Sequence, residues 1–87
     1  MFITSRTQKM IANYIEVLDL AKAGHWDEAH QRVQPYSDRM ACLIHGYLHR
    51  VEGDLNNARY WYSRANESMP DNTLEDEWSR LRILPQN

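Results

Sequence analysis

The stretch that decides the fold is Gly46-Tyr-Leu-His-Arg-Val-Glu-Gly-Asp-Leu-Asn-Asn-Ala-Arg-Tyr-Trp-Tyr62. It is typical of one helix that ends at Gly53 and a second helix that begins after Asp54. Glycine adopts the left-handed conformation that ends many helices without steric cost. The carboxylate of Asp54 can accept a hydrogen bond from a backbone N–H one turn further on, as an N-cap does. The stretch therefore predicts a helical hairpin.

Apolar residues recur at helical spacing on both sides of this hairpin, and we find no alternating β-pattern. Helix start and stop signals divide the chain into five helices, and Ser5, Ser37 and Thr73 are the expected N-caps outside the hairpin. The expected helices run from near Arg6 to Gly24, from Trp26 to Val33, from Ser37 to Gly53, from Leu55 to about Ser68 and from Thr73 to about Leu84. The sequence therefore predicts an all-α domain.

Length and charge restrict the class of protein. The chain has 87 residues, the size of one domain, and a formal net charge of −2. It lacks the basic surplus with which proteins neutralise nucleic-acid phosphates, and no apolar run has the length of a membrane span. Its single cysteine, Cys42, excludes an intrachain disulfide, and the first residues do not resemble a signal peptide. We expect a cytoplasmic protein that binds neither nucleic acid nor a membrane.

The chain matches itself when it is shifted by 29 residues. Identical pairs at this shift include Ala12 with Ala41, Ile15 with Ile44, Gly24 with Gly53, and Ala29 with Ala58. The alanine that follows each glycine turn, Ala29 or Ala58, is small enough to let two helices approach closely where they cross. Self-similarity of two-helix units at a fixed period is typical of helical repeat proteins.

Part of the chain, from about Ile11 to Pro70, resembles the tetratricopeptide repeat. The residues that carry the resemblance are Gly46, Gly53, Asp54, Leu55, Ala58, Tyr62, Ala65 and Pro70, with Gly24 and Trp26 to Ala29 in the first copy. The period is about five residues shorter than the usual period of about 34 residues, and His49 stands where a large apolar residue is expected. The block from Tyr47 to Ala65 also resembles small uncharacterised bacterial proteins.

The resemblance implies a stack of antiparallel helix pairs whose first helices line a concave, peptide-binding face. Within a single domain of residues 1–87 we expect degenerate repeats at about 6–36 and 37–69 and a C-terminal capping helix at about 73–84. The expected face consists of Ile11, Tyr14, Ile15, Leu18, Met40, Leu43, Ile44 and Tyr47. An apolar face of this size is covered by the chain itself, by a second copy or by a partner's amphipathic helix.

These features predict a non-catalytic protein-interaction module or small adaptor rather than an enzyme. Met10, Val17 and Leu20 widen the stripe of the first helix, so we expect a homodimer through that helix. A structural subunit of a larger assembly is an alternative.

A second alternative is a metal-binding or small enzymatic domain centred on His45 and His49. With Cys42 these residues lie on one helical face at offsets of three and four, which suits metal ligands. The fourth ligand would come from Glu52, Asp54 or His30. The competing interpretation places the two histidines in the core, where they would pair with polar groups of tyrosine or tryptophan. Since no CxxC or HExxH motif is present, the core interpretation is favoured, and we expect no cofactor.

Overall fold

The computed structural model describes residues 13–85. This part of the chain forms five helices and contains no strand. The helices are α2 (Tyr14–Lys22), α3 (Trp26–Val33), α4 (Arg39–Glu52), α5 (Leu55–Arg64) and α6 (Leu74–Ile83). The predicted all-α fold of about five helices is therefore confirmed.

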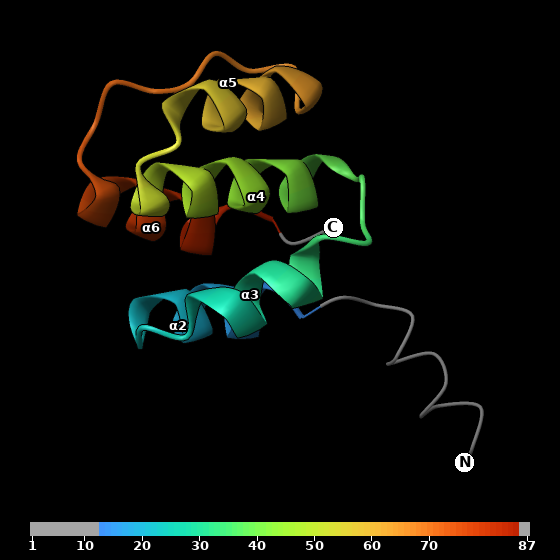
Figure 1. Cartoon of the computed structure of the whole chain (residues 1–87), viewed down its shortest axis with the longest axis vertical. Coiled ribbons are helices and arrows are strands. Elements are labelled where there is room, and N and C mark those ends of the chain that lie inside the picture. The colour runs from blue at the N-terminus through green and yellow to red at the C-terminus, as the bar shows by residue number, and fades with distance from the viewer. Residues whose placement is uncertain (1–12, 86–87) are drawn as a thin grey trace.

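The helices follow one another as two neighbouring pairs and a final helix (Figure 1). α2 packs on α3, α4 packs on α5, and α3 contacts α4 between the two pairs. α6 contacts both α4 and α2, and it is tied to α2 because the Nε1 of Trp78 donates to the carbonyl oxygen of Leu18 at 2.7 Å. The last helix thus contacts one helix of each pair and so links the two pairs.

The expected helix ends at the two glycines are confirmed. Gly24 and Gly53 have φ values of 90° and 87°. In both turns the next N–H reaches back to the last helical turn, from His25 to the oxygen of Leu20 and from Asp54 to that of His49. These bonds satisfy carbonyl groups that a helix end leaves unpaired.

The predicted N-caps Asp54 and Thr73 are also confirmed. The Asp54 carboxylate accepts from the backbone N–H of Asn57 at 3.3 Å, and the Thr73 hydroxyl accepts from that of Asp76 at 3.0 Å. α4 is capped by Asp38 and not by Ser37 as predicted. The Asp38 carboxylate accepts both from the N–H of Ala41 and from the hydroxyl of Tyr14, so a contact with α2 contributes to selecting Asp38 as the cap of α4.

Two further helix boundaries differ from the prediction. α5 ends at Arg64, four residues early, because Asn66 adopts a left-handed conformation with φ of 64°. The N–H groups of Asn66 and Glu67 donate to carbonyl oxygens of the last turn of α5, in the same pattern as at the two glycine turns. α2 begins at Tyr14, where Asn13 caps it. The predicted start near Arg6 lies outside the described residues.

The apolar face predicted to bind a partner is core. Six of its residues are buried: Tyr14, Leu18, Met40, Leu43, Ile44 and Tyr47. Ile15 is half-buried, and Ile11 lies outside the described residues. Leu81 of α6 belongs to the same buried cluster, so the chain's own last helix contributes to covering this face. Of the three ways of covering it that the sequence left open, burial by the chain itself is the one observed.

The outer stripe expected to mediate a homodimer is partly covered as well. Val17 is buried and Leu20 is half-buried against the core, while Met10 lies outside the described residues. In residues 13–85 the structure thus leaves little of this stripe exposed.

α4 and α5 approach closely at Gly46. A Cβ atom added to Gly46 would lie 2.7 Å from the ring of Tyr62 and 3.2 Å from the carbonyl oxygen of Ala58. Ala58 itself is fully buried, as expected for a residue at a helix crossing. Tyr62 is held in place at its far end, because its hydroxyl donates to the fully buried Glu77 of α6 at 2.7 Å.

Candidate metal centre

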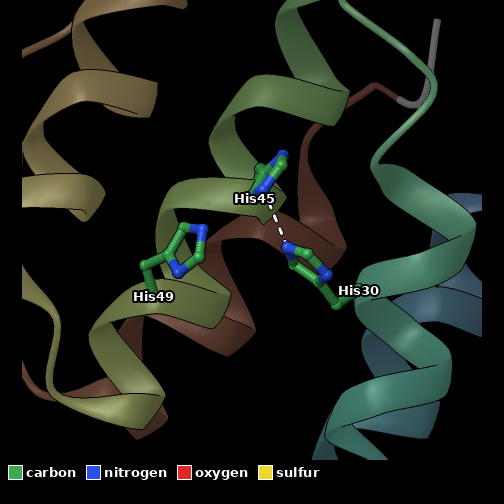
Figure 2. Close-up of side chains that lie close together, drawn as sticks. All are labelled: His30, His45 and His49. Carbon is green, nitrogen blue, oxygen red and sulfur yellow. Dashed lines mark hydrogen bonds between the residues drawn. The ribbon is translucent and has the colours of Figure 1, made fainter.

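Three histidines from two helices converge in the interior between α3 and α4 (Figure 2). His30 comes from α3, and His45 and His49 lie four residues apart on one face of α4. One ligand nitrogen from each ring lies within 4.8 Å of the other two. The Nε2 atoms of His30 and His45 are 3.1 Å apart and share a hydrogen bond. The cluster therefore brings together side chains from both helix pairs.

Two tryptophans, Trp26 of α3 and Trp61 of α5, orient two of the rings. The indole of Trp26 stacks on His30 with centroids 4.7 Å apart, and its Nε1 donates to the carbonyl oxygen of Leu48 at 2.7 Å. This bond fixes the beginning of α3 against α4, so that the next turn of α3 presents His30 to His45. Trp61 of α5 stacks on His45 at 3.8 Å. Each of these two imidazoles therefore has one face covered by an indole ring.

Burial favours the neutral, metal-binding form of two of the three histidines, His30 and His45. His45 and His49 are only 3% and 6% exposed, and His30 is half-buried. Burial, reinforced by His30 and His49, lowers the pKa of His45 to about 4. Burial and the neighbouring His49 also lower the pKa of His30. Two of the three rings are therefore uncharged at neutral pH, so neither has to lose its second proton before it can act as a ligand.

Two buried nitrogens of the cluster lack a hydrogen-bond partner in the described part of the chain. They are the Nδ1 atoms of His45 and His49. The Nδ1 of His49 lies 3.4 Å from an oxygen of Glu52, which is close but lacks hydrogen-bond geometry. Leaving a buried polar atom unpaired costs about 1–3 kcal/mol. The packing of the cluster therefore carries this cost at two atoms.

The structure changes the membership of the predicted site. Cys42 does not join the histidines; its buried thiol faces the carbonyl oxygen of Ser37 at 3.6 Å, and burial raises its pKa. His30, which the sequence offered only as a possible fourth ligand, takes its place. The reason is that α3 packs on α4 beside His45, a contact that spacing along one helix does not reveal.

The two carboxylates named as further ligands lie beside His49 alone. Glu52, Asp54 and His49 form a separate group whose ligand atoms are within 4.8 Å of one another. The Asp54 carboxylate is already engaged as the cap of α5. Neither carboxylate belongs to the group formed by His30 and His45.

Three converging imidazoles are a suitable ligand set for zinc, copper, nickel or cobalt. In a tetrahedral zinc site with Zn–N bonds of 2.0–2.1 Å the nitrogens are about 3.3 Å apart. The 3.1 Å between His30 and His45 is close to this value. One nitrogen of His49 lies within 4.8 Å of a nitrogen of each of the other two rings. The arrangement is therefore compatible with coordination of one metal ion.

Comparisons with protein-family models, with curated proteins and with solved structures give no match to this chain. The likeness to the tetratricopeptide repeat thus stays a prediction from the residues quoted above. None of the helices in residues 13–85 has the length and apolar character that crossing a membrane requires.

Proposed function

We propose that this domain binds one transition-metal ion per chain through His30, His45 and His49. The observation that carries the proposal is the convergence of three imidazoles, from two helix pairs, with ligand nitrogens within 4.8 Å of one another. Neutral imidazole is a common ligand of zinc and of the neighbouring transition metals. The low pKa of His45 favours this ligand form at neutral pH.

The alternative is a purely structural role of the three histidines in the core. That role would have the histidines pair with polar groups of tyrosine or tryptophan. Trp26 instead donates to the carbonyl oxygen of Leu48, and Tyr62 donates to Glu77. The Nδ1 atoms of His45 and His49 are left without a partner in residues 13–85. Coordination of a metal by the opposite nitrogens would stabilise the cluster and so offset the cost of these two unpaired atoms.

The proposal is tested by titrating zinc into protein that has been stripped with a chelator and dialysed, with calorimetric detection at pH 7.5. We expect one zinc per chain. Loss of an outer-shell partner already weakens metal sites by about 10–100-fold, so His30→Asn and His49→Asn should each weaken binding by at least about tenfold. His25→Asn is the matched control, because His25 is exposed and outside the cluster. Stripped protein that takes up no zinc, or ligand variants that bind like the control, would refute the proposal.

A second candidate function is the protein-interaction module predicted from the repeat resemblance, acting through a different surface. Val51, Leu55 and Leu74 are 41%, 44% and 39% exposed. They belong to the end of α4, the start of α5 and the start of α6, which lie at the same end of the molecule in Figure 1. Light scattering after size exclusion tests self-association there: a mass near 10.4 kDa excludes a homodimer, and a doubled mass that Leu55→Glu reduces supports it.

A further inference from the structure

We infer that a metal held by His30, His45 and His49 takes its fourth ligand from outside the chain, as a water molecule or a small single-donor anion. This inference rests on the proposed metal binding and extends it, because it makes the site one that binds a further ligand rather than one closed by protein.

The number of available protein ligands carries the first step. Every histidine, cysteine, aspartate and glutamate of the chain lies within the described residues 13–85. Among these residues only the three histidines share the group that contains His30 and His45. Cys42, one turn before His45, faces the carbonyl oxygen of Ser37. The chain therefore offers three ligands to an ion that is commonly four-coordinate.

Coordination chemistry carries the second step. Structural zinc sites are closed by four protein ligands, whereas sites with three protein ligands keep a position for water or substrate. Three neutral imidazoles leave both positive charges of a divalent ion uncompensated. Water and small anions are the donors that such an ion accepts most readily at the remaining position.

The packing around the rings restricts the size of this ligand. Trp61 covers one face of His45, and Trp26 covers one face of His30. His45 and His49 are buried, while His30 is half-buried and is the ring with access to solvent. An approach from solvent along this one ring suits a ligand of a few atoms with one donor.

The test is a titration of the cobalt(II)-loaded protein with azide, followed by the visible absorption of the metal. We expect a saturable change in the cobalt bands that corresponds to one azide per cobalt. Cys42→Ser is the matched control for a fourth ligand from the chain: its cobalt spectrum should equal that of the wild type. A thiolate-to-cobalt band that disappears in Cys42→Ser would overturn the inference by identifying Cys42 as the fourth ligand.

The outcomes separate this inference from the proposed function. Cobalt that binds stoichiometrically but whose spectrum azide does not change overturns the external ligand and leaves metal binding intact. Failure of both zinc and cobalt to bind overturns metal binding and the external ligand together. Binding of azide that also persists in Cys42→Ser supports both.

Discussion

Replacing Gly46 with alanine tests the close approach of α4 and α5. Alanine is the best helix former, so at an exposed position in the middle of a helix this change stabilises by about 1 kcal/mol. At Gly46 the added methyl group would lie 2.7 Å and 2.9 Å from two ring carbons of Tyr62. Ordinary carbon contacts are about 3.5–4.0 Å, so the ring has to move by about 1 Å. We therefore expect Gly46→Ala to destabilise the protein.

The magnitude follows from what holds the ring. Tyr62 is fully buried, and its hydroxyl donates to the buried Glu77 at 2.7 Å. Overpacking a core costs about 1–3 kcal/mol, and weakening a hydrogen bond to a charged group costs about 1.5–3 kcal/mol. After subtracting about 1 kcal/mol for helix propensity, the expected loss in the free energy of unfolding is about 3 kcal/mol. In a domain of this size that lowers the melting temperature by roughly 12–24 °C.

A double-mutant cycle with Tyr62→Phe identifies the mechanism. Without its hydroxyl the ring is no longer held by Glu77, so the same alanine should cost only about 1 kcal/mol in that background. The assay is urea unfolding of the wild type, both single variants and the double variant, followed by circular dichroism. Equal costs of Gly46→Ala in the two backgrounds, or a stabilising effect in the wild type, would show that the crossing is not as tight as described.

Three further predictions concern stability. Ala58→Leu should lower the free energy of unfolding by about 1–3 kcal/mol or more through overpacking, whereas Asn57→Leu, at the partly exposed neighbouring position, should not. Equal thermal midpoints of the two variants would contradict the placement of Ala58 at the helix crossing. Asp54→Ala should lower the free energy of unfolding, measured with urea, by about 0.5–2 kcal/mol, the usual range for a lost N-cap. The control is Asp71→Ala, in an exposed loop, and equal effects of the two variants would argue against the cap. The pKa of His45 in the folded state, about 4, lies below its ordinary value near 6.5, so the unfolded chain binds more protons than the folded one at acid pH. The free energy of unfolding of the metal-free protein should therefore fall by about 3 kcal/mol as the pH falls from 6.5 to 4. Most of that loss should disappear in His45→Phe and persist in His25→Asn when unfolding is measured at a series of pH values with chelator present.

The features that the sequence predicted correctly are those with local causes. The turn at Gly53 and Asp54 follows from the conformational freedom of glycine and from a carboxylate one turn away from its backbone donor. The same local chemistry explains why the stop at Gly24 and the cap at Thr73 were predictable. The early end of α5 had a local signal too, because asparagine also tolerates the left-handed conformation that Asn66 adopts.

The cap of α4 required the tertiary structure. Ser37 and Asp38 are both good capping residues, and nothing within the helix distinguishes them. The hydroxyl of Tyr14, 24 residues earlier in the chain, donates to the Asp38 carboxylate and so contributes to selecting Asp38. The fate of the apolar face was decided in the same way, since its residues are apolar whether a partner or α6 covers them.

The candidate metal centre shows the same division between local and tertiary causes. Helical spacing correctly placed His45 and His49 on one face of α4, because four residues make about one turn. It also placed Cys42 there, but a helix face does not specify which neighbour it meets. His30 lies 15 residues before His45, and the two rings meet because α3 packs on α4, where Trp26 donates to the carbonyl oxygen of Leu48. The sequence alone thus placed two of the three converging histidines together and named His30 only among three possible further ligands, and the packing of α3 on α4 brings His30 to them.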